Sequence, residues 1–334
     1  MAKKSAAKKA LGNMKMTTGV KVALAVILTV ILGASCIFTR QIDEALRLGV
    51  KASGGADGGS DSVALNGGVL SAHFINVGQG DSTILKFPDD KTMIVDFGDT
   101  GSMKKPDGGA QSIREKIIGY IDENISGGDE NFIFDYAILT HSDSDHCGNM
   151  KYILEKYPAR IIYRPNVIAA NGGFIDPAIA VTDSAAADVN EKLWTLSGAG
   201  YADVAVKTTA VYTDAVSKMY EQVTRGSETF TPKVIVSDGR RGAGRGGKPL
   251  QDISGRDAAG DPYSVTFYGP QSPRYKSGAS DEWNNCSNIS VTEYQGKKIL
   301  MSGDAEKAAT DEFVAAYGEI TFDVDVIKLG HHGS

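Results

Sequence analysis

The chain has 334 residues, of which 42% are hydrophobic and 23% charged, enough for one large folded domain or two small ones. Its 35 lysines and arginines are outnumbered by 41 aspartates and glutamates, an excess that argues against holding a polyanion by charge alone and suits a cation-binding site. Three cysteines, odd in number and far apart, provide neither a disulfide framework nor a thiolate zinc site.

An uninterrupted apolar stretch spans residues 22–38 and follows a basic segment, residues 1–21, that contains no acidic residue. The apolar stretch has about the minimum length of a transmembrane helix, and a basic flank stays in the cytoplasm. We therefore expect a single-pass anchor in the cell membrane, with the rest of the chain extracytoplasmic. A cleaved signal peptide, or a signal lipidated at Cys36 in the run Gly-Ala-Ser-Cys, stays open as an alternative.

Residues 39–68 are predicted to be a flexible linker. From residue 51 onward this segment consists largely of Gly, Ser, Ala and Asp, which cannot bury apolar surface. The folded domain is therefore expected over residues 69–334.

Apolar runs bounded by turn residues predict strands in the first half of this domain. They cover residues 70–77, 82–87, 92–96, 133–140 and 160–163. Ile113, Ile117 and Ile121 have the spacing of one helix face, which predicts a helix over residues 112–124. A second, shorter helix is expected over residues 150–156.

The second half of the domain follows a less regular stretch, residues 166–260, in which one helix is expected over residues 209–224. Further strands are predicted over residues 263–269, 288–294, 298–302 and 324–329, and a helix over residues 306–317. Strand-rich halves separated by helices favour an α/β fold. The expected architecture is an αββα sandwich, in which two sheets pack face to face with helices outside.

Four potential metal ligands occur within six residues, directly after the apolar strand that ends at Thr140. They are His141, Asp143, Asp145 and His146. A strand end followed by a tight loop directs alternate side chains into one pocket, and imidazole and carboxylate are donors that Zn²⁺ or Mn²⁺ accepts. A polar loop that only caps the next helix is the alternative. Two histidines at this spacing, in a chain with five, favour the metal site.

The run His-x-Asp-x-Asp-His resembles the signature of the metallo-β-lactamase family, in the variant where Asp replaces the second His. Other segments resemble the same family in the same order, namely residues 74–82, 93–96, 300–304 and 326–334. The forms Gly-Gln-Gly-Asp and His-His-Gly-Ser are particularly similar to the C-terminal domain of the ComEC/Rec2 competence proteins. The resemblance covers about residues 70–334, with a poorly matched middle. Since the resembled fold continues beyond its last motif, we expect the C-terminus to be truncated.

Carried over by position, the resemblance implies two divalent metal ions. His141 and Asp143 would bind one ion, Asp145 and His146 the other, and Asp304 would bridge them.

The resemblance also implies roles for three further residues. One of the terminal histidines would complete the second site, and His332 is favoured over His331 because it stands directly before Gly333. Asp96 would orient ligands through hydrogen bonds without binding metal itself.

The sequence departs from the family in one respect, because no histidine lies between His146 and His331, where the family usually supplies a ligand. Residues 284–288 resemble the polar motif that replaces it. Candidate substrate-binding residues are therefore Asn285, Ser287, Asn288 and Lys328. An exposed strand residue is the alternative for Lys328. The expected metal is zinc, and manganese is the alternative because an Asp in place of a His makes the site a harder donor set.

A hydroxide that bridges two cations can attack phosphorus or a carbonyl group at neutral pH, with Asp145 as the catalytic residue that accepts a proton. The resemblance therefore favours a membrane-anchored, metal-dependent hydrolase, first of all a phosphodiesterase or nuclease. Hydrolysis of small esters, lactones or phosphocholine-type substrates is an alternative, and a non-catalytic membrane-bound binding module is another. The expected partners are the membrane and a phosphodiester or small ester. Nucleic acid is a further possible partner, and no protein partner is evident in the sequence.

Overall fold

The structure is a computed structural model that describes residues 68–104, 108–174, 176–180, 205–237, 250–270, 283–318 and 323–333. The chain divides into two compact units, residues 1–64 and 65–334, and every described residue belongs to the second. The predicted basic segment, the apolar segment 22–38 and nearly all of the linker lie outside the described residues. Within the described ranges, none of the helices has the length and hydrophobicity to cross a bilayer.

Six strands form the first sheet, in the spatial order β1-β2-β3-β6-β7-β12. Their bounds are β1 Ser71–Phe74, β2 Thr83–Lys86, β3 Thr92–Val95, β6 Phe134–Ile138, β7 Ala159–Pro165 and β12 Lys233–Ser237. The first three strands are antiparallel, whereas β3, β6, β7 and β12 run parallel to one another. Parallel neighbours end at the same edge, so the segments that follow β3 and β6 lie side by side.

Five strands form the second sheet, in the order β13-β14-β15-β16-β17. Their bounds are β13 Leu250–Arg256, β14 Pro262–Phe267, β15 Ser290–Tyr294, β16 Lys297–Met301 and β17 Val326–Lys328. All neighbours are antiparallel except β16 and β17, which are parallel. The expectation of an irregular stretch over residues 166–260 is corrected, because β12 and β13 come from it. Both are edge strands of their sheets, where a weak local pattern is completed by pairing with distant residues.

The remaining elements are short. Three two-stranded sheets pair β4 with β5, β8 with β9 and β10 with β11. Their bounds are β4 Ser102–Lys104, β5 Ala110–Ser112, β8 Val167–Ala169, β9 Ala205–Lys207, β10 Val223–Arg225 and β11 Glu228–Phe230. The short helices are η1 Asp122–Ser126, α4 Ser144–Cys147, α6 Pro177–Ala180, η4 Asn284–Cys286 and η6 Gly330–Gly333.

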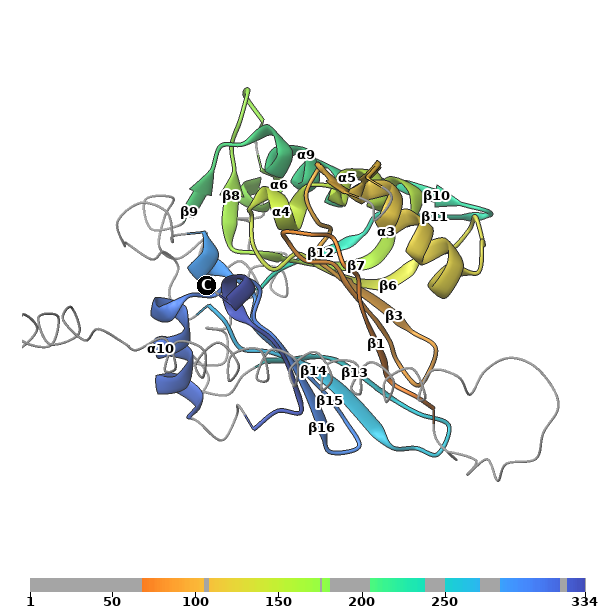
Figure 1. Ribbon diagram of the computed structural model, residues 1–334, viewed down its shortest axis with the longest axis vertical. Helices are drawn as coiled ribbons and strands as arrows, with labels where there is room; N and C mark the ends of the chain where they lie inside the picture. The colour runs from red at the N-terminus through yellow and green to blue at the C-terminus, as the bar shows by residue number, and fades with distance from the viewer. Residues whose placement is uncertain are drawn as a thin grey trace, which may run out of the picture. The chain divides into compact units, whose positions relative to one another are not determined.

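The two large sheets face each other across a shared apolar core (Figure 1). The ring of Phe87, just after β2, stacks on Tyr263 of β14 with the ring centroids 4.6 Å apart. Tyr163 of β7 stacks on Phe267 of β14 at the same distance. These pairs connect the sheets at two places along β14 and fix their spacing.

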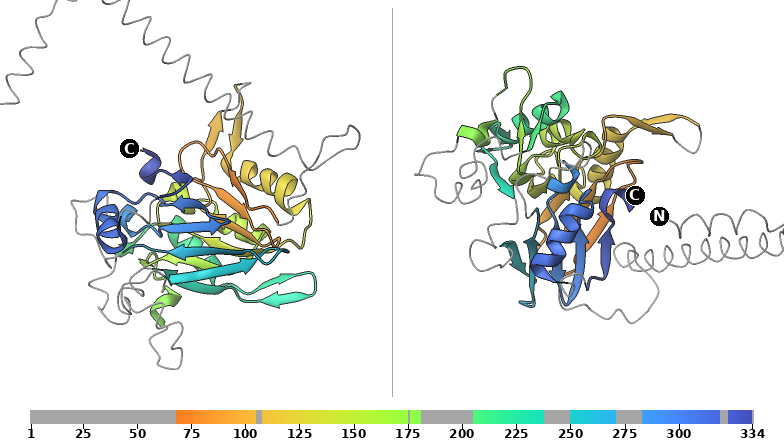
Figure 2. Two further views of the ribbon diagram at one scale, coloured as in Figure 1. Left: turned by 90° about the horizontal axis from the view of Figure 1, so that it is seen from below. Right: turned by 90° about the vertical axis from the view of Figure 1, so that its left-hand side faces the viewer.

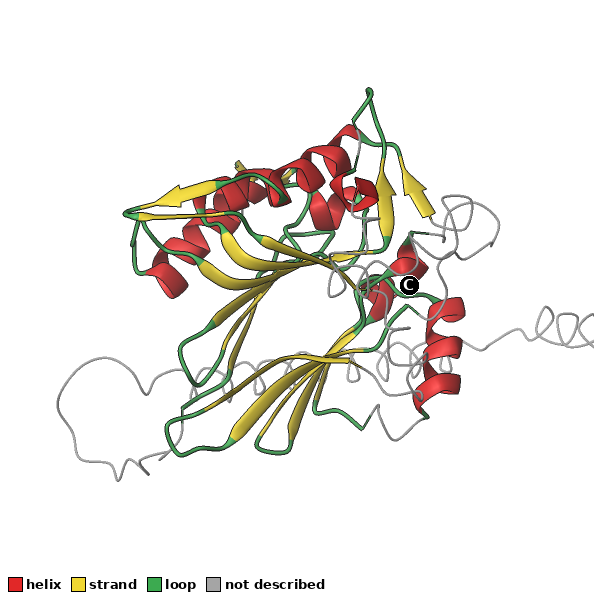
Figure 3. Cartoon of the chain, turned by 180° about the vertical axis from the view of Figure 1, so that it is seen from behind, coloured by secondary structure: helices red, strands yellow, loops and turns green. Residues whose placement is uncertain are grey.

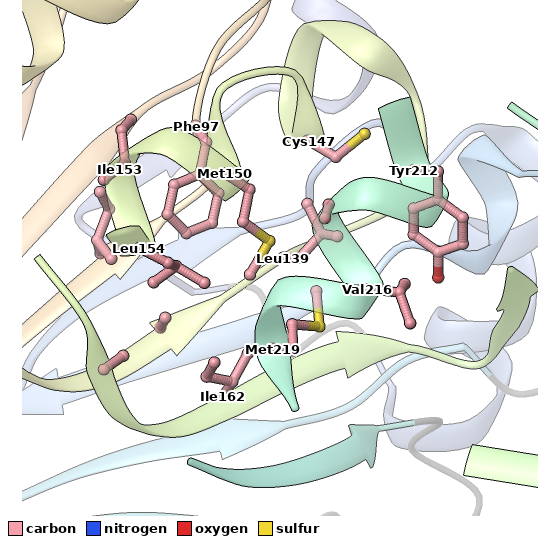
Figure 4. Close-up of a cluster of buried hydrophobic side chains, with 14 of the residues drawn as sticks. Phe97, Leu139, Cys147, Met150, Ile153, Leu154, Ile162, Tyr212, Val216 and Met219 are labelled. Carbon is pink, nitrogen blue, oxygen red and sulfur yellow. The ribbon is translucent and has the colours of Figure 1, made fainter. Parts of the chain in front are cut away.

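Helices cover the outer face of the first sheet, and one helix lies at an end of the second sheet (Figure 3). The first sheet is covered by α3 Ile113–Ile121, α5 Met150–Lys156 and α9 Ala210–Met219, and Figure 4 shows the cluster of buried side chains beneath α5 and α9. The second sheet packs against α10 Lys307–Tyr317, visible in Figure 2, with the Phe313 ring 5.3 Å from that of Tyr268. The described residues therefore form a mixed α/β fold with two sheets face to face, as the sequence predicted.

The helix α3 follows directly from its sequence. Ser112 is the N-cap, and its side chain accepts a hydrogen bond from the backbone N–H of Glu115. The buried residues are Ile113, Ile117 and Ile121, so the apolar spacing marks the face that packs on the sheet. The predicted helix is confirmed, with α3 ending at Ile121 and the π-helix η1 continuing the helical turns to Ser126.

Candidate metal centre

The predicted metal-binding residues follow two pairs of parallel strands, one pair in each sheet. Asp96 and His141 come just after β3 and β6, whereas Asp304 and His332 come after β16 and β17. The ring centroids of His146 and His332 lie 5.3 Å apart. The ends of the two strand pairs therefore meet, and residues far apart in sequence gather there.

The Asp96 carboxylate anchors the loop that carries the histidine and aspartate motif. Its Oδ1 accepts a hydrogen bond from the Thr140 backbone N–H at 2.8 Å. Its Oδ2 accepts hydrogen bonds from Thr140 Oγ1 at 2.7 Å and from His146 Nδ1 at 2.8 Å. All three residues are buried. The ring of His146 is thus held from behind, with Nε2 directed toward the other donors, as in metal-bound imidazoles supported by a carboxylate.

Three potential ligand atoms converge on the Nε2 atom of His146 and make a group of four with it. Asp304 Oδ2 lies 3.3 Å from His146 Nε2 and 3.1 Å from His332 Nε2. Asp145 Oδ2 lies 3.3 Å from His332 Nε2 and 4.0 Å from His146 Nε2. Ligands at about 2.0–2.2 Å from a tetrahedral zinc ion are separated from one another by about 3.3–3.5 Å. Three of these four separations are close to this range, so the group can hold one cation, while Asp145 and His146 stand farther apart at 4.0 Å.

Asp81, which was not among the predicted site residues, also belongs to this group. Donor atoms of Asp81, His146, Asp304 and His332 all lie within 4.8 Å of one another. The preceding Gly80 has a φ of 93°, and a Cβ there would overlap the backbone oxygen of Asp145. Only glycine allows the loop to approach so closely. The Gly-Gln-Gly-Asp run was thus the signal for this residue in the sequence.

The protonation of the two buried histidines suits a cation site. Burial, together with the nearby His146 ring, lowers the pKa of His141 to about 3, so that its imidazole is neutral. Burial also lowers the pKa of His146, but Asp96 and Asp304 outweigh this effect and raise it to about 10. The Nε2 atoms of both rings are buried without a hydrogen-bond partner. A cation would supply the missing partner and replace the proton on His146.

The Asp304 carboxyl remains ionised in this surrounding. Burial raises its pKa, but the adjacent imidazole of His146 outweighs burial and holds the pKa below its usual range. The His141 Nε2 lies 3.8 Å from Asp304 Oδ2. His141 is therefore farther from Asp304 than His146 and His332 are.

Two predicted ligands are turned to other partners. The Oδ1 of Asp143 accepts a hydrogen bond from Lys207 Nζ at 2.7 Å. His331 Nδ1 lies 2.9 Å from Glu306 Oε1, whereas His332 faces the centre. The structure thus brings together Asp145, His146, Asp304 and His332, and it directs Asp143 and His331 elsewhere.

The four predicted substrate-binding residues have internal contacts instead. Asn285, Ser287 and Asn288 are all buried. Asn285 Oδ1 accepts a hydrogen bond from the backbone of α10, Ser287 Oγ accepts one from Asp304, and Asn288 Nδ2 donates to the Leu139 carbonyl. Lys328 contacts the carboxylates of Asp81 and Asp304. These side chains position the loops and carboxylates of the centre, and their contact with a substrate stays a prediction.

The sequence of this region matches a known family. Residues 75–189, which include Asp81, Asp96 and the motif from His141 to His146, match the family model described as the metallo-beta-lactamase superfamily. This segment is a metallo-beta-lactamase superfamily domain. The match agrees with the predicted enzyme class, a metal-dependent hydrolase. No curated protein is similar enough to the chain to count as a match.

Solved structures of metallo-beta-lactamase proteins are similar to the chain at low sequence identity. The metallo-beta-lactamase fold protein YhfI from Bacillus subtilis is 11% identical, with a TM-score of 0.28, over 67% of this chain and 55% of that protein. The metallo-beta-lactamase SMB-1 bound to 2-mercaptoethanesulfonate is 13% identical, with a TM-score of 0.35, over 78% and 76% of the two chains. The short form of human tRNase Z is 12% identical, with a TM-score of 0.30, over 77% and 76%.

The residues of this centre fit a divalent metal ion. Two imidazole nitrogens and two carboxylate oxygens face one point, and the nitrogen of His146 lacks any other partner. Such mixed nitrogen and oxygen donors accept zinc or manganese.

Proposed function

We propose that this domain is a metal-dependent phosphodiesterase, with nucleic acid as one candidate substrate. The observation that carries the proposal is the convergence of Asp145, His146, Asp304 and His332 at separations that suit a single cation. Zinc is the first candidate for that cation and manganese the second. When bound, it would acidify water and offset the negative charge that develops at phosphorus.

The protein's own residues divide the remaining tasks. Asp96 holds the His146 ring in place through the 2.8 Å hydrogen bond from Nδ1. Asp145 is partly exposed, with 17% of its side chain accessible, so its carboxylate can both face the cation and accept a proton from water. His332 is the most accessible of the four donors, at 28% of its side chain. We therefore expect the substrate to approach from the side of η6.

Two lysines near the centre reduce its electrostatic repulsion of an anionic substrate. Lys207 Nζ lies 2.7 Å from Asp143, and Lys328 Nζ lies 3.0 Å from Asp304. These ammonium groups reduce the negative potential that the aspartates would otherwise present to a phosphodiester. The resemblance of the sequence motifs to the ComEC/Rec2 domain supports the same substrate class. A small ester or lactone is the competing substrate.

We further propose that residues 22–38 hold the domain at the extracytoplasmic face of the cell membrane. The support for this is the sequence alone, an apolar stretch preceded by six lysines and no acidic residue. Protease accessibility of the domain in intact cells would test this orientation.

The test of the proposed function compares three substrates in the presence of added Zn²⁺ or Mn²⁺. The full chain in detergent is given single-stranded DNA, a chromogenic bis-aryl phosphate and an aryl ester. We expect turnover of at least one phosphodiester, and a loss of at least about 100-fold in Asp145→Ala with an unchanged circular dichroism spectrum. Asp214→Ala, in an exposed pair with Lys151, is the control. Turnover of the ester alone, or retained activity in Asp145→Ala, would refute the proposal.

A further inference from the structure

Asp143 belongs to the sequence motif of the metal centre, but its carboxylate is already paired inside the protein. Lys207 Nζ donates to Asp143 Oδ1 at 2.7 Å and also lies 3.8 Å from the centroid of the Trp283 ring. Trp283 is held in turn by a hydrogen bond from Nε1 to the Val206 carbonyl. Only 12% of the Lys207 side chain is accessible. Lys207 is thus fixed on two sides, and its charge offsets that of Asp143.

The carboxylate predicted to bridge two metals is shared in a similar way. Asp304 Oδ2 faces the histidines, whereas Oδ1 accepts a hydrogen bond from Lys328 Nζ at 3.0 Å. Lys328 Nζ also donates to the Gly303 carbonyl at 2.9 Å and lies 2.5 Å from Asp81 Oδ2. An ammonium group has three N–H donors, and here three oxygens surround it. One oxygen of Asp304 is therefore unavailable to a second cation.

What is left for a second cation is a weak donor set. Of the two residues expected to bind it, Asp143 is paired through Oδ1 with Lys207, and His141 offers only its Nε2 because Nδ1 contacts Thr140 Oγ1. The additional carboxylate of Asp81 has Oδ2 against the ammonium group of Lys328. A divalent ion bound by one imidazole and water would gain little over hydration. The ammonium groups of Lys207 and Lys328 already neutralise Asp143 and Asp304, the carboxylates that such an ion would bind.

We propose that the centre binds one divalent cation, and that Lys207 and Lys328 take the electrostatic place of the second. This inference rests on the proposed function, since it assumes the cation site formed by Asp145, His146, Asp304 and His332. It departs from the two-metal site that the sequence resemblance implies. Lys207 and Lys328 are positioning residues in this arrangement, because they act through Asp143 and Asp304.

The test measures zinc binding rather than activity. The full chain in detergent, stripped of metal, is titrated with Zn²⁺ by calorimetry, and bound metal is counted by mass spectrometry. Two matched variants of the same loop, Asp143→Asn and Asp145→Asn, are compared with the wild type. We expect one zinc per wild-type chain. We also expect a dissociation constant within about three-fold of wild type for Asp143→Asn, and one raised by more than about 30-fold for Asp145→Asn.

A third variant, Lys207→Met, tests the role of the lysine directly. Freed from its partner, Asp143 should bind metal together with His141, so that the stoichiometry rises from one zinc to two. Two zinc ions in the wild type, an equal loss of affinity in Asp143→Asn and Asp145→Asn, or a stoichiometry of one in a folded Lys207→Met would each overturn the inference. No zinc in the wild type would instead overturn the proposed function.

Discussion

The Nδ1 of His146 donates a 2.8 Å hydrogen bond to Oδ2 of Asp96, and both residues are buried. The two residues lie 50 positions apart, one after β3 and the other in α4. Asp96 adopts a left-handed backbone conformation with a φ of 59°, which is unfavourable for most side chains and tolerated by aspartate. We infer that this backbone conformation is kept because it directs the Asp96 carboxylate toward His146.

Asp96→Asn should therefore weaken metal binding without removing a ligand. The amide cannot accept hydrogen bonds at both of its ends, so either the Thr140 backbone N–H or the His146 ring loses its acceptor. We expect zinc affinity to fall by about 10–100-fold and the free energy of unfolding to fall by about 1–3 kcal/mol. Calorimetric titration and urea denaturation measure the two effects. Asp99→Asn, whose side chain accepts hydrogen bonds from the backbone N–H and the hydroxyl of its neighbour Thr100, is the control. Equal zinc affinity in both variants would show that Asp96 does not support the centre.

The two terminal histidines should behave differently when each is replaced by alanine. His332→Ala removes a donor that lies 3.1 Å from Asp304 Oδ2, so zinc affinity should fall by at least about 100-fold. His331→Ala removes a partly exposed contact with Glu306, which should cost at most about 1 kcal/mol of stability and leave zinc affinity nearly unchanged. Titration of the two variants with zinc shows which of the two histidines binds the metal. A larger loss in His331→Ala would assign the ligand to the other histidine.

Zinc binding should release about one proton from the buried histidine pair near pH 8. In the metal-free protein the pKa of His146 is raised to about 10, so the ring is protonated at this pH. The pKa of His141 is lowered to about 3, so that ring has no proton to release. Zinc affinity should rise with pH until the pKa of His146 is reached. Calorimetry in buffers of different ionisation enthalpy counts the protons, and a pH-independent affinity between pH 7 and 9 would contradict this assignment.

The same shift has a consequence for the stability of the metal-free protein. Because the folded-state pKa of His146 lies above the usual 6.5, its protonation stabilises the fold fully below pH 6.5. This contribution is lost as the pH rises through about 10. Bound zinc replaces the proton on His146 and should remove this pH dependence of stability. Thermal unfolding at several pH values, with and without zinc, measures the difference.

The sequence alone determined the types of donor and the loops that carry them. The His-x-Asp-x-Asp-His run directly after an apolar strand predicted the centre, and the apolar spacing of Ile113, Ile117 and Ile121 predicted the helix α3. These features are local, because a strand end or a helix face is set by residues close together in the chain.

Only the tertiary structure decided which donors face one another. Asp143 and Lys207 are 64 positions apart, and Lys328 reaches Asp304 across 24 positions. Nothing in the local pattern of Asp143 and Asp145 distinguishes them, yet one pairs with a lysine and the other faces His332. The physical reason is that a charged side chain is neutralised by whichever opposite charge the packing of two sheets brings within reach, and sequence spacing does not encode that distance.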